Sequence, residues 1–172
     1  MEISSIVNRK SLFLVIILVV VAIAANAQTL FQFPFIQDVE GTNLSNAWAL
    51  STSGELSPYT YTYAEPPAGS FLLVLWTRIT GGFDAFGFST NSGRLFMLVC
   101  HLASIAFLYG ITRKLTKSDT AAIIAALVFV FSPLTIGYQR RVLLENLMLP
   151  SLLASVYLIV GDRRRLTHYI LS

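Results

Sequence analysis

Charged residues are scarce in this chain of 172 residues. Asp, Glu, Lys and Arg together make up only 12% of it, whereas 55% belongs to the hydrophobic set. Soluble domains average about 25% charged and about 45–50% apolar residues. So few charges could not cover a soluble domain of this size, and intrinsic disorder is excluded because disordered chains are poor in apolar residues. The composition therefore indicates an integral membrane protein.

Residues that hold cofactors are also rare. The single cysteine, Cys100, excludes an internal disulfide and is expected to be inert packing. His101 lies in an apolar run without a metal partner nearby in sequence, so we expect a hydrogen-bonded core histidine. No His/Cys cluster has zinc spacing and no glycine-rich nucleotide loop is present, so no cofactor is predicted and only a divalent metal stays open. The net charge of +3 is small and its basic residues flank apolar runs, so no nucleic-acid partner is expected.

Apolar residues gather in four long runs, at 12–25, 95–111, 121–136 and 147–160. Crossing a bilayer takes about 20 residues, a length that each run reaches with its flanks. We therefore predict an all-α membrane fold with about four transmembrane helices, over about 11–30, 93–112, 120–137 and 143–160. A shorter run at 68–79 suits an interfacial or re-entrant helix better.

The first run also has a second interpretation. Basic residues precede its apolar core, which ends in the sequence ANA at 25–27, and this pattern is typical of a cleaved signal peptide. A cleaved signal fits a secreted protein, but three more apolar runs follow. We favour an uncleaved first span.

Basic residues support a cytoplasmic N-terminus. With that orientation, eight Lys and Arg residues face the cytoplasm and four face outward, as the positive-inside rule expects. Six of the nine acidic residues then lie outside. We expect a multi-pass plasma-membrane protein, one transmembrane module over residues 1–172 with an external loop over about 28–92. Residues 168–172 read as the start of another span, so we expect the N-terminal part of a longer protein.

The external loop has local order of its own. Residues 43–51 read as a short helix that ends near Gly54, and Pro67 begins a second helix over 68–80 that Gly81 ends. Alternating tyrosines at 58–63 read as extended chain between the two helices. The simplest interpretation of these aromatic residues is an aromatic belt at the membrane surface.

Six short motifs follow one another in and after this loop. They are QDVEGT at 37–42 with NAWAL at 46–50, AEPPAG at 64–69, TGGF at 80–83, SGRL at 92–95, SPL at 132–134 and QRRVLLEN at 139–146. Their order resembles the GT-C glycosyltransferases that use polyprenyl-phosphate sugars, above all the protein O-mannosyltransferases and the bacterial aminoarabinose-type transferases. The resemblance runs from about residue 10 to 165. It implies a lipid-linked sugar donor and a protein, lipid or glycan acceptor.

Two positions depart from the family pattern. Relatives have an adjacent acidic pair soon after the first span, whereas Val39 here separates Asp38 from Glu40. Either Asp38 takes the acid's role with a shift of one residue, or Val39 has replaced the catalytic carboxylate. Glu65 stands where many relatives have histidine, and a carboxylate differs from an imidazole in charge and donor capacity.

Sugar transfer from a lipid phosphate needs a base for the acceptor's proton and cations for the leaving phosphate. The predicted catalytic residues are Asp38 as the base and Glu40 as the neighbour that orients acceptor or donor. Substrate binding is assigned to Glu65, Arg140, Arg141 and Glu145, with the two arginines as a phosphate clamp. Arg141 and Glu145 lie four residues apart, so we expect an ion pair on one helix face.

Each assignment has a plainer alternative. Asp38 and Glu40 could be solvated loop acids or helix caps, and Arg140 and Arg141 could be snorkelling anchors. A catalytically silent membrane protein is the second functional hypothesis. A transporter ranks last, because the centres of the spans are apolar apart from His101.

Overall fold

The structure, a computed structural model, describes residues 9–56 and 67–160. This portion of the chain contains seven α-helices and no strand. They are α1 (Arg9–Ala27), α2 (Asp38–Ser53), α3 (Ala68–Thr80), α4 (Ser89–Thr116), α5 (Asp119–Phe131), α6 (Pro133–Gln139) and α7 (Glu145–Ile159). The all-α class predicted from the sequence is therefore confirmed for the described residues.

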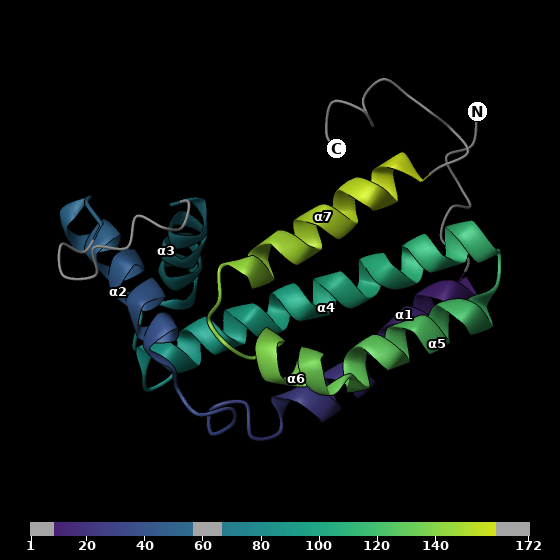
Figure 1. Ribbon diagram of the computed structural model, residues 1–172, viewed down its shortest axis with the longest axis horizontal. Helices are drawn as coiled ribbons and strands as arrows, with labels where there is room; N and C mark the ends of the chain where they lie inside the picture. Colours follow the sequence, from purple (N-terminus) through teal and green to yellow (C-terminus); the bar gives the residue numbers. More distant parts are fainter. Residues whose placement is uncertain (1–8, 57–66, 161–172) are drawn as a thin grey trace.

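The longest helix, α4, forms the axis of the molecule (Figure 1). Helices α7, α5 and α1 pack along its length, and the short α6 lies beside its N-terminal half. Helices α2 and α3 pack against each other and project from the same end of α4. The segment predicted as an ordered loop is thus a helix pair attached to one end of a bundle.

Membrane-crossing length is reached by one described helix. Helix α4 has 28 residues, which at about 1.5 Å per residue span about 42 Å, more than the hydrocarbon core of about 30 Å. The described apolar stretches of α1, α3 and α7 are shorter, at 10–17 residues each. The expected four transmembrane helices are therefore not confirmed, although the second predicted span lies wholly within α4.

The third predicted span is broken. Helices α5 and α6 together are long and apolar enough to cross a membrane, but they are bent by 60° at Ser132. Proline disfavours helical backbone in the preceding residue and lacks a donor for the helix ladder. Ser132 is accordingly extended, with ψ at 126°, and Pro133 begins α6. The bend turns α6 and the following arginines back toward the start of α4.

Helices α2 and α3 end where their glycines predicted. Gly54 and Gly81 both adopt the left-handed conformation that ends a helix, with φ of 75° and 98°. The bounds of α3, Ala68–Thr80, match the sequence prediction. Helix α2 begins earlier than expected, at Asp38 rather than at residue 43, so the acidic motif forms its first turn.

Two hydrophobic clusters hold the bundle together. One joins α1, α4 and α5 near the middle of α4, through Ala22, Ile105 and Ala126 among others. The other joins α2, α3, α4, the turn before α7 and the start of α7, around Leu44, Leu73, Met97, Val142 and Leu147. The second cluster fixes the helix pair to the bundle and so positions the candidate site.

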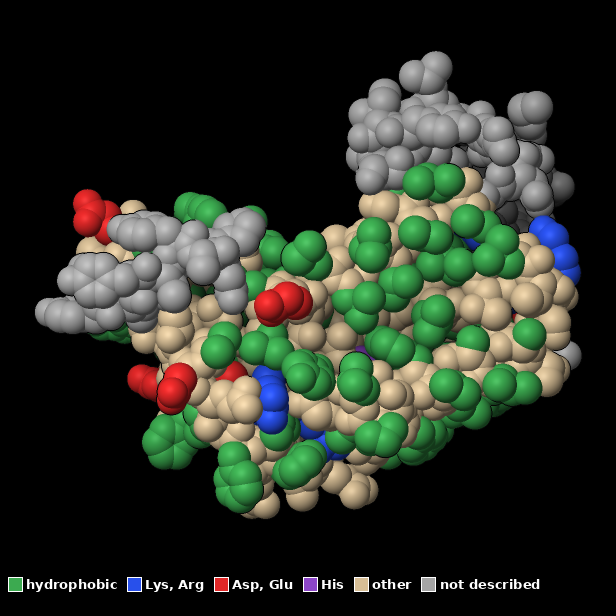
Figure 2. Space-filling model, viewed as in Figure 1, with side chains coloured by type: hydrophobic (Ala, Val, Ile, Leu, Met, Phe, Trp, Pro, Cys, Tyr) green, Lys and Arg blue, Asp and Glu red, His purple; other side chains and the backbone are tan. Residues whose placement is uncertain are grey.

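Hydrophobic side chains also cover much of the outside. On the face in Figure 2 the few acidic and basic side chains lie mainly near the end that carries α2 and at the far end of α4. The surface between these ends shows hydrophobic side chains among uncharged side chains and backbone. An outer surface of this kind suits lipid, and it agrees with the membrane class inferred from composition.

Candidate functional site

A buried ion pair ties the start of α2 to the start of α4. Glu40 and Arg94 are both fully buried, with no exposed surface on either side chain. Arg94 donates from Nε to Glu40 Oε1 at 3.0 Å and from Nη2 to Glu40 Oε2 at 2.9 Å. Such two-pronged pairs fix geometry as well as charge, because the planar guanidinium matches the carboxylate.

Both members of the pair hold further backbone. Arg94 also donates to the carbonyl oxygens of Leu30 and Pro34, at 3.0 and 2.8 Å. Glu40 accepts from the backbone N–H of Val142 at 3.0 Å and from that of Gln37 at 3.3 Å. One ion pair therefore connects the segment after α1, the first turn of α2, helix α4 and the segment that follows α6.

Asp38 lies next to this network, in the first turn of α2. It is the first residue of α2 and its side chain is exposed, two positions before the buried Glu40. No hydrogen bond or ion pair holds its carboxylate among the described residues. The N-terminus of a helix favours a negative charge, which fits both a base and a simple helix-end charge.

Arg141 reaches the residue beside Asp38. Its Nη1 donates to Gln37 Oε1 at 3.0 Å, and its guanidinium carbon lies 5.7 Å from the centroid of the Tyr138 ring. Its Nε atom is buried and has no hydrogen-bond partner among the described residues. The guanidinium is thus held next to the first turn of α2, and its Nε–H can still donate a hydrogen bond.

Arg140 points to a different neighbour. It donates to the carbonyl oxygen of Ala25 at 2.9 Å, and its Nη1 lies 3.5 Å from Thr29 Oγ1. Its side chain is buried, and its Nε also has no partner within the described ranges. Burial, and then the charge of Arg94, lower the pKa of Arg140. Both causes act in the same direction, because burial and a neighbouring like charge each disfavour the charged form of a guanidinium.

Glu145 does not join this group. It is the first residue of α7 and exposed, and the ion pairs found among the described residues are Arg94–Glu40 and Arg113–Asp119. The expected pair with Arg141 is therefore wrong. Residues 140–144 form a turn rather than a helix, so a spacing of four does not bring the side chains together. Asn146 fixes this turn by donating to the carbonyl oxygens of Tyr138 and Arg141.

Glu65 lies outside the described residues, so its expected role stays a prediction. Its motif ends within them, where Pro67 precedes the first turn of α3. A Cβ added at Gly69 would lie 2.6 Å from Leu144 Cδ2. This close approach brings the start of α3 against the segment that carries Arg141.

His101 is buried in α4 with 1% of its surface exposed, and its ring centroid lies 5.2 Å from that of Phe129. Neither ring nitrogen has a hydrogen-bond partner among the described residues. The buried position of His101 was predicted correctly, whereas the expected hydrogen bond to its ring is absent among the described residues.

Cys100 is buried in the second hydrophobic cluster, where packing was expected. The portion of the chain that the structure describes has no group of three or more His, Cys, Asp or Glu able to hold a metal ion.

A comparison with protein families matches residues 64–170 to the dolichyl-phosphate-mannose-protein mannosyltransferases. The match covers more than half of the chain. The chain belongs to this family. No curated protein and no solved structure gives a significant match.

Membership of the dolichyl-phosphate-mannose-protein mannosyltransferase family makes the chain a GT-C-type glycosyltransferase at family level. The matched range contains Arg94, Arg140, Arg141 and helices α3 to α7. Asp38 and Glu40 precede it, so the acidic motif rests on the geometry above. The buried pair links the two regions, since Glu40 lies before the matched range and Arg94 within it.

Arg94 is the member of the candidate site that the sequence did not single out. Arg94 lies in the SGRL motif at the start of the second predicted span, and no role was predicted for it. A signal was available, because arginine is almost never fully buried unless it is paired. An arginine at the edge of a long apolar helix therefore calls for a carboxylate, and only a few external acids were candidates.

Proposed function

We propose that this chain transfers a sugar from a polyprenyl-phosphate donor to an acceptor at the outer face of a membrane. The acceptor is a hydroxyl group of a protein, or else of a lipid or glycan. The chain is proposed to cross the plasma membrane several times with its N-terminus in the cytoplasm. The observation that carries the proposal is the hydrogen bond from Arg141 to Gln37, the residue next to the exposed carboxylate of Asp38 at the start of α2.

Each residue has a chemical task in this proposal. Asp38 takes the proton of the acceptor hydroxyl as its oxygen bonds to the anomeric carbon of the sugar. The bond from that carbon to the phosphate oxygen breaks, and the polyprenyl phosphate leaves with the electron pair. Arg141 and Arg140 stabilise the phosphate dianion that develops, and arginine suits this because its planar fork binds two oxygens.

Glu40 is assigned a positioning role rather than contact with substrate. Its oxygens are fully engaged with Arg94, Val142 and Gln37. Through them it holds the first turn of α2 against the turn that carries Arg141. Glu65, in the motif before α3, and Glu145, exposed at the start of α7, are proposed to contact the acceptor or the sugar at the rim.

The test is transfer from a labelled dolichyl-phosphate mannose donor by the full-length protein in nanodiscs. Asp38→Asn should reduce turnover by about 100-fold or more, the size expected for loss of a general base. Asp84→Asn is the control, because Asp84 is an exposed acid in the loop between α3 and α4. Unchanged turnover in Asp38→Asn would remove Asp38 from the role of base.

A silent protein is the second candidate function. Val39 stands within the acidic motif and is 43% exposed, an apolar side chain at a helix start beside the proposed site. If the catalytic carboxylate was lost at this position, Val39→Asp should create transfer activity that the natural protein lacks. Activity in the natural protein would exclude this alternative.

A further inference from the structure

Helix α3 turns most of its large apolar side chains outward. Four of them are 45% to 72% exposed: Phe71, Leu72, Leu75 and Ile79. The buried residues of this helix include two with hydroxyl groups, Ser70 and Thr77, beside Leu73. A surface helix of a soluble protein has the reverse arrangement, with its apolar face toward the core. The outer face of α3 therefore suits an apolar neighbour that the described residues do not supply.

The exposed apolar side chains of α3 form one stripe. Phe71, Leu75 and Ile79 follow one another at a spacing of four, so they share a face of the helix. Arg78 follows Phe71 by seven residues and lies at the edge of this face. Its side chain is exposed, and no ion pair holds it within the described ranges. An arginine in this position can keep its stem in apolar surroundings while its charged head reaches lipid headgroups.

Helix α2, which packs against α3, has a more polar outer face. Its exposed positions Ser45, Trp48 and Thr52 recur at a spacing of three and four, and two of the three carry hydroxyl groups. Tryptophan suits the boundary between lipid and water. Two packed helices at one end of the molecule thus expose surfaces of different polarity, and the continuous apolar stripe belongs to α3.

Helix α3 is attached to α4 close to the start of the long helix. Trp76 donates from Nε1 to the carbonyl oxygen of Ser92 at 3.0 Å, and its ring stacks on that of Phe96 with centroids 5.2 Å apart. The 28 residues of α4 are about 12 Å longer than a hydrocarbon core, or about four residues at each end when the helix is centred. Ser92 is the fourth residue of α4. The attachment therefore lies where hydrocarbon meets headgroups.

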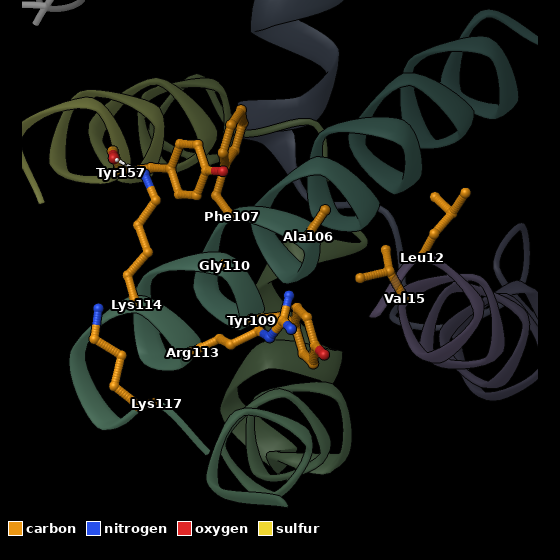
Figure 3. A pocket seen from close by; sticks show the side chains of 10 residues that line it. All are labelled: Leu12, Val15, Ala106, Phe107, Tyr109, Gly110, Arg113, Lys114, Lys117 and Tyr157. Atoms are coloured by element: carbon orange, nitrogen blue, oxygen red, sulfur yellow. Dashed lines mark hydrogen bonds between the residues drawn. The ribbon is translucent and has the colours of Figure 1, made fainter. Parts of the chain in front are cut away.

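The other end of α4 is basic. Arg113, Lys114 and Lys117 lie around its last turn (Figure 3). The positive-inside rule counts lysines and arginines rather than net charge, and it assigns this end to the cytoplasm. Helix α3 is then on the outer side, as in the topology proposed above. Its axis runs across that of α4 rather than along it (Figure 1), so α3 lies in the membrane plane when α4 crosses the bilayer.

We propose that α3 binds the outer surface of the lipid bilayer, with its axis in the plane of the membrane. Phe71, Leu75 and Ile79 lie among the upper parts of the acyl chains, Arg78 lies at the lipid phosphates, and α2 is on the water side. Helices of this kind enter about 5–10 Å into the boundary between headgroups and acyl chains. The proposal rests on the membrane placement proposed above, and it does not depend on glycosyl transfer.

The position of α3 also sets the depth of the candidate site. A Cβ added at Gly69 would lie 2.6 Å from Leu144 Cδ2, so the first turn of α3 is in close contact with the segment after Arg141. With α3 at the level of the headgroups, Arg141 lies near the depth of lipid phosphates.

The experiment measures the depth of labelled side chains in the full-length protein in phosphatidylcholine nanodiscs. A nitroxide is attached to Leu75→Cys in a variant without other cysteines. Electron paramagnetic resonance then compares collisions with oxygen, which concentrates in lipid, and with a water-soluble nickel chelate. We expect collisions with oxygen to dominate at Leu75→Cys. Ser45→Cys, at an exposed position of α2, is the matched control, and collisions with nickel should dominate there.

Two further labels test the orientation of α3. Phe71→Cys and Ile79→Cys should lie at the same depth, although they are eight residues and about 12 Å apart along the helix. A depth difference close to that length would overturn the proposal, because α3 would then enter the bilayer end-on. Nickel access at Leu75→Cys equal to that at Ser45→Cys would also overturn it. Few collisions with either reagent would overturn it as well, because protein would then cover the stripe.

A label within α4 separates this proposal from the membrane placement on which it rests. Val99 is 45% exposed, and Val99→Cys should lie deeper in lipid than Leu75→Cys. Lipid access at Val99→Cys with water access at Leu75→Cys refutes only the position of α3. Water access at both positions refutes the membrane placement as well. The measurement uses neither donor nor acceptor, so its result does not depend on the turnover of Asp38→Asn.

Discussion

Glu40 and Arg94 form the one fully buried ion pair found among the described residues of this chain. The two residues are 54 positions apart, and between them they engage four other backbone groups. The exposed Asp38 is one of the residues that this pair fixes in place. The pair thus has a structural role, because it holds the segments of the candidate site together.

Breaking the buried pair should destabilise the protein strongly. Glu40→Gln leaves the Arg94 charge buried without a counter-charge, and losses of this kind reach about 3–5 kcal/mol. Thermal unfolding in detergent, followed by intrinsic fluorescence, checks this. The double variant Glu40→Gln/Arg94→Met should lose less than the sum of the two single variants. Additive losses would mean that the two side chains do not interact energetically.

Arg141 should matter for the donor more than for stability. It is partly exposed and holds one side-chain oxygen, that of Gln37. Arg141→Gln should raise the KM for dolichyl-phosphate mannose about 10- to 100-fold, the range for one hydrogen bond to a charged group. Initial rates against donor concentration measure the change. An unchanged KM would place the donor phosphate elsewhere.

Arg140 should behave differently from Arg141. It is buried and donates to the Ala25 carbonyl oxygen, so Arg140→Gln should lower both donor affinity and the temperature of unfolding. Comparing the two variants in the unfolding assay separates the roles. Equal unfolding temperatures for both variants would contradict the packing of Arg140 against α1.

Gly93 should be intolerant of any side chain. An added Cβ would lie 2.7 Å from Val142 Cγ2 and 3.1 Å from Leu44 Cδ2. Gly93→Ala should therefore cost about 1–3 kcal/mol through overpacking. Gly41→Ala is the matched control within α2, because nothing lies within 4 Å of its Cβ. That control should stabilise by up to about 1 kcal/mol, as alanine favours a helix. Similar effects of both variants would refute the close approach.

His101 should be replaceable by an apolar residue. Both of its ring nitrogens are buried without a partner among the described residues, and such atoms carry a penalty that an apolar group does not. His101→Leu should keep or raise the unfolding temperature. Asn146→Leu, which removes two hydrogen bonds to backbone, should lower it. A clear loss of stability in His101→Leu would indicate that a bound group satisfies the ring.

Local features of the fold could be predicted because local residues cause them. Pro67 and Gly81 predicted the start and the end of α3 correctly, because the fixed φ of proline suits the start of a helix and glycine adopts the left-handed conformation that ends one. The break in the third span has a local cause as well, Pro133, yet the apolar run around it was interpreted as one span. Hydropathy alone does not register a bend.

Long-range contacts could not be predicted in this way. Arg140 and Arg141 are adjacent in sequence, but one reaches Ala25 and the other Gln37. The two side chains point in different directions because the chain turns after α6. The pairing of Glu40 with Arg94 likewise depends on how α2 meets α4, which no spacing within either helix encodes. The sequence singled out the acidic residues as candidates, but it did not predict Arg94 as the partner of Glu40.

The wide sequence separation within the site has a consequence for biosynthesis. Glu40 leaves the ribosome first, Arg94 follows 54 residues later, and the Val142 amide that completes the network comes 102 residues after Glu40. A nascent chain cut short before α6 would hold the acidic segment but neither arginine of the proposed clamp. The hydrogen-bond network around the proposed site can therefore form only after helices α1 to α6 have been made.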